Sequence, residues 1–260
     1  MRQIQSGAEP FFFPGGRTGC LLTHGFTASP QEVRDLGTHL AAEGYTVLGL
    51  RIFSHGTQHQ DMNRARPVDW LASIEDGYHL LVNQCDRIYF VGSSVGGTLS
   101  LILATHFPPA GVVTLSTPIR LPPDPRLDRI KPILKPLSYL LPAIPKGPPT
   151  WHDPSAQDDR VAYTAYPLRA ILELGSLLAM MRTALPDVRV PTLLMHSKND
   201  RFIPPEHMQQ IFERLGSSDK EMVWVEDSSH VITCDAEREV VFQKVTDFLQ
   251  RIEKSRQEGA

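Results

Sequence analysis

Cysteine is scarce in this chain of 260 residues, which contains only Cys20, Cys85 and Cys234. Three cysteines cannot all pair within one molecule, and none of them forms a C-x-x-C motif. Free thiols are typical of proteins from a reducing compartment, whereas secreted domains use cysteines in pairs. We therefore expect three free thiols and a cytoplasmic protein.

Long apolar segments are also missing. The first ten residues lack the apolar stretch of a secretory signal. No apolar run approaches the roughly 20 residues that a membrane-spanning helix needs. The sequence therefore predicts neither a signal peptide nor a stable insertion into a membrane.

Charge of one sign is not in excess, because 26 Lys and Arg stand against 29 Asp and Glu, for a formal net charge of −3. Nucleic acids attract proteins through concentrated positive charge, so we expect no nucleic-acid partner. With 41% hydrophobic and 21% charged residues, the composition is that of a globular protein with a sizeable core. The length suits one α/β domain, with or without an insertion, and no feature specifies an oligomeric state.

What is present is an alternation of short apolar runs with amphipathic stretches, over residues 1–118 and again over residues 167–260. Strands separated by helices of this length imply βαβ units and a parallel sheet with right-handed crossovers. We expect strands near 20–23, 45–50, 87–91, 111–116, 192–196 and 221–225, and helices near 30–43, 67–83, 96–106, 168–185, 204–215 and 236–252.

Two of these helices carry signals for their ends or faces. Ser29, Pro30 and Glu32 predict a helix start, with Ser29 as N-cap and Glu32 completing a capping box. The last helix is predicted to bury one apolar face. That face contains Val240, Val241, Val245, Phe248, Leu249 and Ile252.

The alternation stops at Pro118, and residues 119–166 are rich in proline. Proline at this density disrupts regular strand and helix alternation. The segment also contains many Leu, Ile and Tyr residues, which a simple linker would not need. We predict an α/β core formed by residues 1–118 and 167–260, and an inserted cap or lid formed by residues 119–166. Its prolines are Pro122, Pro123, Pro125, Pro132, Pro136, Pro142, Pro145, Pro148, Pro149 and Pro154.

The sharpest motif lies at residues 92–96, where the sequence GSSVG matches G-x-S-x-G between a predicted strand and a predicted helix. This context is that of a nucleophile elbow, a turn too tight for side chains two residues before and after the serine. The alternative is a phosphate-binding loop, but no lysine follows the glycines as it does in a P-loop. We predict Ser94 as a nucleophile and prefer it to Ser93, which lacks glycine at both flanks.

A serine nucleophile needs a base, and the base needs an orienting acid. After a nucleophile elbow the acid comes next in the chain and the histidine last. Asp200 follows the strand predicted at 192–196, and His230 follows the strand predicted at 221–225. We therefore predict His230 as the base and Asp200 as the acid. Asn199, Asp227 and His196 are the neighbouring alternatives, and their expected roles are in turns or in packing.

Acyl transfer also needs N–H donors for the developing oxyanion. The Val95 amide follows the nucleophile, and the Phe26 amide lies in a His24-Gly25-Phe26 loop after an early strand. We predict these two amides as the oxyanion hole.

His55, His59 and Asp61 lie close together in a loop that contains Gly56. Helical zinc sites place two histidines one turn apart on a helix, which a loop does not provide. We therefore expect a structural loop near the mouth of the site, with no metal and no cofactor.

Together these motifs resemble bacterial carboxylesterases and monoacylglycerol lipases of the α/β-hydrolase superfamily. The likeness extends from residue 9 to the last helix and is weakest over residues 119–166. The matching segments are residues 9–13, 24–26, 54–56 and 92–97, Asp200, and residues 229–233.

The resemblance implies an α/β-hydrolase fold, with a mostly parallel eight-stranded sheet flanked by helices and a small cap. It also implies hydrolysis of carboxylic esters or monoacylglycerols without a cofactor, and it assigns the same catalytic and oxyanion roles to the residues predicted above. Two features depart from the family. Ser93 stands where a long apolar residue often precedes the nucleophile, and the cap is unusually rich in proline.

Two other functions fit parts of the sequence. An amide or peptide hydrolase of the aminopeptidase type would need an acidic group for the substrate amine, which Glu173 or Asp153, Asp158 and Asp159 could supply. A non-catalytic binding protein can share the fold, since fold alone does not fix function. Such a protein usually lacks a member of the triad, whereas all three are present here.

Overall fold

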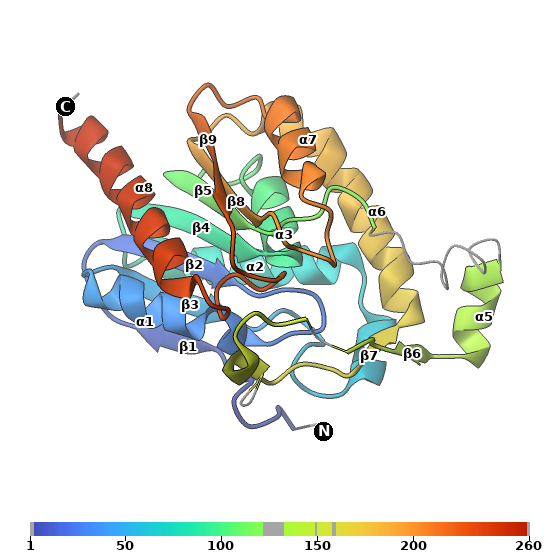
Figure 1. The fold of residues 1–260 in the computed structure, drawn as a ribbon. Coiled ribbons are helices and arrows are strands. Elements are labelled where there is room, and N and C mark those ends of the chain that lie inside the picture. The colour runs from blue at the N-terminus through green and yellow to red at the C-terminus, as the bar shows by residue number, and fades with distance from the viewer. Residues whose placement is uncertain (1–2, 122–132, 149, 158–159, 259–260) are drawn as a thin grey trace.

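The computed structural model describes residues 3–121, 133–148, 150–157 and 160–258. Its centre is a sheet with the strand order β1-β3-β2-β4-β5-β8-β9 (Figure 1). All neighbouring strands are parallel except β1 and β3, which confirms the predicted α/β architecture. The strands are β1 (Phe11–Phe13), β2 (Thr18–Thr23), β3 (Thr46–Leu50), β4 (Arg87–Ser93), β5 (Gly111–Leu115), β8 (Thr192–Ser197) and β9 (Lys220–Val225).

The main sheet has seven strands in the described residues, whereas the resemblance implied eight. At one edge of this sheet β1 pairs with β3. The residues before β1 turn away from the sheet, because the Ala8 N–H donates to Gln5 O (2.9 Å) and the Gln5 N–H donates to Gly56 O (2.7 Å). These bonds tie that segment to the loop after β3.

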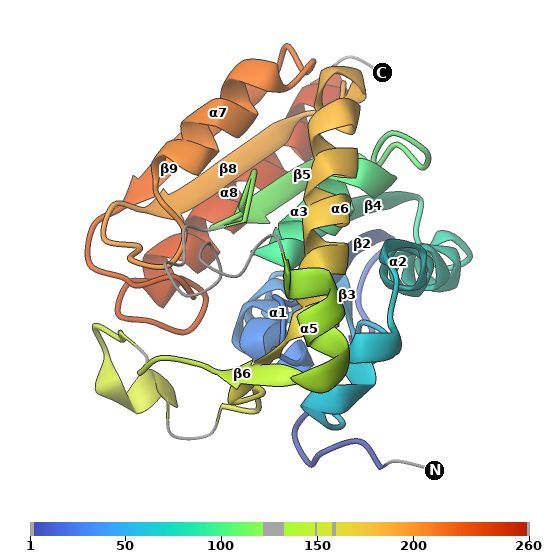
Figure 2. The ribbon, with the colours of Figure 1, turned by 90° about the vertical axis from the view of Figure 1, so that its right-hand side faces the viewer.

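Helices cover both faces of the sheet (Figures 1 and 2). One buried apolar cluster joins the sheet to α1 and α8, and a larger one joins it to α2, α3, α6 and α7. The layers are therefore helix, sheet and helix, as βαβ units require. The helices are α1 (Arg34–Ala42), α2 (Pro67–Val82), α3 (Val95–Leu103), α6 (Leu168–Ala184), α7 (Glu206–Arg214) and α8 (Arg238–Glu258), with the short 3-10 helices η1 (Pro30–Val33), η2 (His59–Arg64), η4 (Pro154–Gln157) and η5 (Leu185–Asp187).

Helix α8 confirms its predicted apolar face except at one residue. Val241 is fully buried, whereas the neighbouring Val240 is 47% exposed. Successive helical residues lie about 100° apart, so Val240 falls outside the stripe formed by the other predicted residues. The prediction for Val240 was therefore wrong.

Residues 119–166, called the inserted segment from here on, contain short elements that proline content alone did not predict. Strands β6 (Ala143–Pro145) and β7 (Ala165–Pro167) pair antiparallel in a separate small sheet, and α5 (Leu134–Leu140) lies at the outside of the molecule and contacts α6 (Figure 1). Pro136 lies in the first turn of α5, where a missing N–H removes no helical hydrogen bond. Pro122, Pro123, Pro125, Pro132 and Pro149 lie outside the described residues.

The three cysteines are free, which confirms that prediction. Burial raises the pKa of the Cys20 and Cys85 thiols, and raises the pKa of Cys234 to about 12. All three are therefore protonated near neutral pH. In the described part of the chain, no helix is both long and apolar enough to cross a membrane.

Two buried histidines, His24 and His55, stabilise the backbone at the carboxyl ends of β2 and β3. His24 Nδ1 donates to Gly25 O (2.9 Å), and Nε2 accepts from the Ile52 N–H (3.2 Å). The His55 ring meets the His24 ring edge-on, with 5.0 Å between centroids. Burial lowers the pKa of His24 to about 4 and lowers the pKa of His55 well below its usual value. Both imidazoles are therefore neutral at pH 7 and act as fixed hydrogen-bonding groups.

The α8 face gives a matched pair of stability tests. Val241→Ala removes two methyl groups from a fully buried position, so we expect the free energy of unfolding to fall by about 2 kcal/mol. Val240→Ala makes the same chemical change at an exposed position and should alter stability by less than about 0.5 kcal/mol. Urea unfolding of both variants measures the difference, and equal losses would contradict the assigned face.

His24 predicts a loss of stability in mild acid. The unfolded chain binds a proton on this histidine below about pH 6.5, whereas the folded protein does so only below about pH 4. Stability should therefore decrease as the pH falls from about 6.5 towards 4, because the unfolded state binds more protons there. His24→Gln should flatten this decrease in urea unfolding measured against pH. The exposed His106→Gln is the control, and an unchanged slope in His24→Gln would refute the assignment.

Candidate active site

Ser94 occupies a tight turn between β4 and α3. It is the N-cap residue of α3 and has φ 51° and ψ −114°, a strained backbone conformation for serine. Its N–H donates to Leu115 O on the neighbouring strand (2.7 Å). The predicted strand, turn and helix around Ser94 are therefore present, and the turn is anchored across the sheet.

The two flanking glycines are required by close backbone contacts. A Cβ atom on Gly92 would lie 2.2 Å from the carbonyl carbon of Gly96, and one on Gly96 would lie 2.2 Å from Thr23 O. Neither backbone atom can move without shifting β2 or α3. The steric reason given for the G-x-S-x-G spacing is thus met at both positions.

The structure brings Ser94, His230 and Asp200 into one hydrogen-bonded line. Ser94 Oγ lies 3.0 Å from His230 Nε2, and His230 Nδ1 lies 2.7 Å from Asp200 Oδ2. These atoms come from the ends of β4, β8 and β9, which are far apart in the sequence. The arrangement can move a proton from the serine to the imidazole while the aspartate holds the other ring nitrogen.

Asp200 is buried and accepts hydrogen bonds on both oxygens. Oδ1 accepts from the Phe202 and Ile203 N–H groups (both 2.8 Å). Although burial alone would raise the pKa of Asp200, the facing His230 and the hydrogen bonds from His196 and His230 hold it well below its usual range. The carboxylate of Asp200 is therefore ionised at neutral pH, and its negative charge faces the imidazole of His230.

His196 is a site residue that sequence reasoning treated only as packing. It is fully buried in β8, and its Nε2 lies 3.0 Å from Asp200 Oδ2 and 3.1 Å from Ile203 O. Both neighbours are acceptors, so Nε2 carries a proton. Its position four residues before Asp200 was visible in the sequence, but the hydrogen bond depends on the bend after β8.

The alternatives for the acid lie outside this line. The Asn199 side chain donates to Glu226 O, and Asp227 Oδ1 lies 2.6 Å from His152 Nδ1. The Asp227 side chain is 77% exposed. Among the described residues, neither side chain is hydrogen-bonded to His230.

The loop after β2 carries Phe26 and approaches Ser94. A Cβ atom built on Gly25 would lie only 3.3 Å from Ser94 Cβ, so the two backbones nearly touch. Among the described residues, no acceptor takes the N–H of Phe26 or of Val95. Both amides are therefore available to a substrate oxygen.

Backbone strain gathers at the same edge of the sheet. The non-glycine residues with positive φ in the described chain are Thr27, Ser54, Ser94 and Ser116. They follow β2, β3, β4 and β5 respectively, at the carboxyl ends where parallel sheets bind ligands. Strain of this kind persists where surrounding contacts fix a functional geometry.

Glu32 has a different role in the structure from the capping-box role that was predicted from the sequence. Ser29 forms no side-chain cap, and the Glu32 carboxylate turns inward instead of closing a capping box. Its Oε1 accepts from the Gly25 N–H (2.9 Å) and from Ser93 Oγ (2.8 Å). The capping-box prediction was therefore wrong, because the buried donors of Gly25 and Ser93 compete for the same carboxylate. Ser93, which stands where the family often has a long apolar residue, therefore has a hydrogen-bond partner in Glu32.

The inserted segment reaches this carboxylate as well. Arg160 donates to Glu32 Oε2 (2.8 Å), and its guanidinium lies over the Trp151 ring, 4.8 Å from the centroid. Glu32 is 5% exposed, so the pair is largely desolvated. One partly buried ion pair therefore links the inserted segment, the loop after β2 and Ser93.

The histidine-containing loop after β3 is structural in its contacts. Thr57 Oγ1 donates to Asp61 Oδ2 (2.7 Å), His55 Nδ1 donates to Phe53 O (3.0 Å) and His59 packs against Tyr163. Within the described residues, no group of three or more His, Cys, Asp or Glu side chains is arranged to hold a metal.

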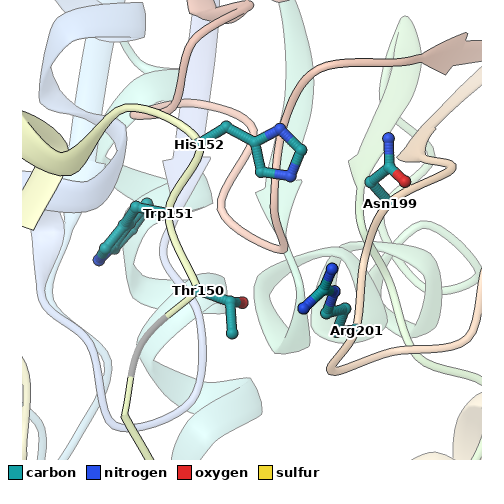
Figure 3. A pocket seen from close by; sticks show the side chains of 5 residues that line it. All are labelled: Thr150, Trp151, His152, Asn199 and Arg201. Atoms are coloured by element: carbon teal, nitrogen blue, oxygen red, sulfur yellow. The ribbon is translucent and has the colours of Figure 1, made fainter.

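A cavity of about 220 Å³ opens between the inserted segment and the loop that carries Asp200. Thr150 and His152 lie on one side of it, and Asn199 and Arg201 lie on the other (Figure 3). Its lining includes the residues on either side of Asp200 but none of Ser94, Asp200 and His230.

The acidic residues suggested for an amine-binding site are engaged elsewhere. Glu173 lies 3.8 Å from Arg66, and Asp153 Oδ1 accepts from the Ser155 N–H and hydroxyl. Asp158 and Asp159 lie outside the described residues.

Comparison with known proteins matches this architecture to a family of hydrolases. A family model described as serine aminopeptidase, S33, matches residues 16–237. The chain is 34% identical to the thermostable monoacylglycerol lipase of Bacillus sp. (strain H-257), over 95% of this chain and 96% of the relative. It is 29% identical to the carboxylesterase of Bacillus subtilis (strain 168), over 94% of this chain and 97% of the relative.

Comparison with solved structures gives the same result as the comparison of sequences. One from work on two metagenome-derived lipolytic enzymes, LipS and LipT, superposes with a TM-score of 0.86 at 31% identity, covering 96% of this chain and all of that one. The monoacylglycerol lipase of Paleococcus ferrophilus shares the fold with a TM-score of 0.80 at 18% identity, over 94% and 98% of the two chains. The chain therefore belongs to the α/β-hydrolase family of the serine aminopeptidase S33 model, among its esterases and lipases.

Proposed function

We propose that this protein hydrolyses carboxylic esters, monoacylglycerols among them, through an acyl-enzyme formed on Ser94. The observation that carries the proposal is the line of hydrogen bonds from Ser94 Oγ through His230 to Asp200, at 3.0 and 2.7 Å. Nucleophile, base and orienting acid within this reach define a serine hydrolase by geometry and role.

In the first half of the reaction, His230 Nε2 takes the proton of Ser94 as Oγ attacks the ester carbonyl. The Phe26 and Val95 amides donate to the oxygen that becomes negative, and α3 begins at Val95, so its N-terminal dipole favours the same charge. Asp200 keeps the proton on Nδ1 and stabilises the imidazolium. His230 then gives its proton to the leaving alcohol, and the acyl group stays on Ser94.

In the second half, a water molecule takes the place of the alcohol. His230 removes a proton from this water, and the hydroxide attacks the acyl carbonyl. Collapse of the intermediate returns the proton to Ser94 Oγ and releases the carboxylic acid. No cofactor enters any step.

An apolar cluster beside Phe26 supports an acyl-binding role for this side of the site. Leu168 and Ile171, at the start of α6, pack with Phe26, Leu121 and Ile144. Apolar walls with few polar groups suit the hydrocarbon part of an ester. The two curated relatives are named a monoacylglycerol lipase and a carboxylesterase, which fits the same substrate class.

We also propose that residues 119–166 act as a cap over the core formed by residues 1–118 and 167–260. The Arg160–Glu32 ion pair supports this, since it ties the inserted segment to the loop after β2. Ile144 and Tyr166 contribute to the apolar cluster beside Phe26. A cap placed there excludes water from the reacting groups.

Amide hydrolysis is the second candidate, because the matching family model is described as a serine aminopeptidase. An aminopeptidase needs a carboxylate for the substrate amine. The pairing of Glu173 with Arg66 and of Asp153 with Ser155 speaks against these two residues in that role. We therefore favour esters.

Ser94→Ala tests the nucleophile. We expect kcat for p-nitrophenyl butyrate to fall by about 10⁴-fold or more, because activity without the serine comes only from binding and the oxyanion donors. Ser93→Ala is the matched control and should keep most of the activity. Retained turnover in Ser94→Ala would exclude the mechanism, and faster wild-type turnover of a matched anilide than of the ester would favour the aminopeptidase.

Glu32→Gln tests the support of the oxyanion loop. The amide keeps the size of the side chain but loses the charge that holds Arg160 and strengthens the bond from Gly25. We expect kcat to fall about tenfold with little change in KM, a smaller loss than removing an oxyanion donor itself. The exposed Glu239→Gln is the control. A loss of thermal stability with unchanged kcat would show that Glu32 serves only folding.

A further inference from the structure

Lys146 stands beside the oxyanion loop without a part in the reaction described above. It follows β6, and its N–H donates to Thr164 O (2.9 Å), which fixes the start of the side chain. Its Nζ donates to Thr27 Oγ1 (2.5 Å), and Thr27 in turn donates to Phe26 O (2.5 Å). The ammonium is therefore two hydrogen bonds from the residue whose amide faces the substrate oxygen.

The same ammonium lies against an aromatic wall that leads to the catalytic base. Nζ is 5.1 Å from the centroid of the Tyr166 ring, and Tyr166 stacks on Phe202 at 6.1 Å with 10° between the planes. Phe202 meets His230 edge-on at 5.1 Å. Tyr166 also packs against the cluster of Leu168 and Ile171. The wall therefore connects that cluster to His230, the group that protonates the leaving alcohol.

The charges around Lys146 do not balance. Burial and the nearby Arg160 charge lower the pKa of Lys146 to about 7, against the opposing effect of Glu32. Glu32 is already paired with Arg160 at 2.8 Å. In the described part of the chain, no carboxylate lies within 4.0 Å of Nζ. Two cations therefore share one carboxylate, and an added anion would favour the charged lysine.

Lys146 also has hydrogen-bonding capacity to spare. An ammonium has three donors, and Thr27 Oγ1 is the acceptor that it contacts among the described residues. The ring of Tyr166 attracts the positive charge but accepts no conventional hydrogen bond. The ammonium is therefore held in place by one hydrogen bond, and its two other donors can bind a ligand.

We propose that Lys146 binds an anionic group, a carboxylate or a phosphate, on the alcohol part of the ester. The inference rests on the ester hydrolysis proposed above and narrows its substrate class to esters of acidic alcohols. The anion would accept a charge-assisted hydrogen bond from Nζ while the acyl group lies against the apolar cluster near Phe26. Lys146 then sets specificity and takes no part in proton transfer.

Four short esters form the test set, which compares neutral and anionic groups on each side of the bond. They are monobutyrylglycerol, its phosphate monoester, the butyrate ester of glyceric acid, and monosuccinylglycerol, which carries its charge on the acyl side. Initial rates in a pH-stat give kcat/KM for each substrate with the wild type and with variants. The measured quantity is the ratio of each anionic substrate to monobutyrylglycerol.

We expect the wild type to favour the two esters with an anionic alcohol. In Lys146→Met, which keeps the length but not the charge, this ratio should fall by about tenfold or more, the size of a charge-assisted hydrogen bond at a partly buried site. Lys146→Arg should keep most of the preference. Arg201→Met is the matched control, because Arg201 is an exposed cation at the cavity beside Asp200 and should not affect the ratio. The phosphate and carboxylate arms identify which anion fits better.

Inhibition of the wild type by glycerol phosphate and by glycerol provides a measurement that does not depend on the variants. We expect the phosphate to inhibit monobutyrylglycerol hydrolysis at a concentration at least about tenfold lower. The proposal is overturned if the ratios of Lys146→Met equal those of the wild type, if Arg201→Met loses the preference instead, or if only monosuccinylglycerol is favoured. Turnover of monobutyrylglycerol without any anion preference refutes this inference alone, whereas no turnover of any ester refutes the proposed function.

Discussion

The close approach of three backbone segments at the carboxyl edge of the sheet is the constraint on which the site depends. Gly92 and Gly96 leave no room for a Cβ atom against α3 and β2, and a Cβ atom on Gly25 would lie only 3.0 Å from the Glu32 carboxylate. This packing forces Ser94 into a positive φ and holds the loop after β2 against it. The sheet order, with β2 and β4 adjacent, is what makes the approach possible.

Buried hydrogen bonds then fix the polar groups that stand on this frame. Asp200 uses one oxygen for two backbone amides and the other for two imidazoles, His230 and His196. Glu32 similarly collects an amide, a hydroxyl and a guanidinium. Both carboxylates are satisfied at nearly every lone pair, and such fully bonded networks hold a unique geometry in a low-dielectric interior.

The inserted segment contributes charge as well as apolar cover. Arg160 completes the network of Glu32, and Lys146 brings a second cation to the loop that carries Phe26. The inserted segment therefore brings positive charge to the loop that carries Phe26. A segment that served only to exclude water would not need two partly buried cations, since their desolvation is costly.

The sequence by itself determined the α/β alternation, the elbow at Ser94 and the order of Asp200 and His230, because these depend on local periodicity and on spacings along the chain. The predicted apolar face of the last helix wrongly included Val240, although the step of about 100° between successive residues places it outside the stripe formed by the others. Only the tertiary structure decided the partners of Glu32, Ser93, His196 and Lys146. Their hydrogen bonds join segments 61 and 119 residues apart, as for Glu32 with Ser93 and Lys146 with Thr27, or depend on a bend after a strand. A side chain that could satisfy a nearby helix end turns inward when a buried donor offers a stronger bond, and no local pattern reveals that competition.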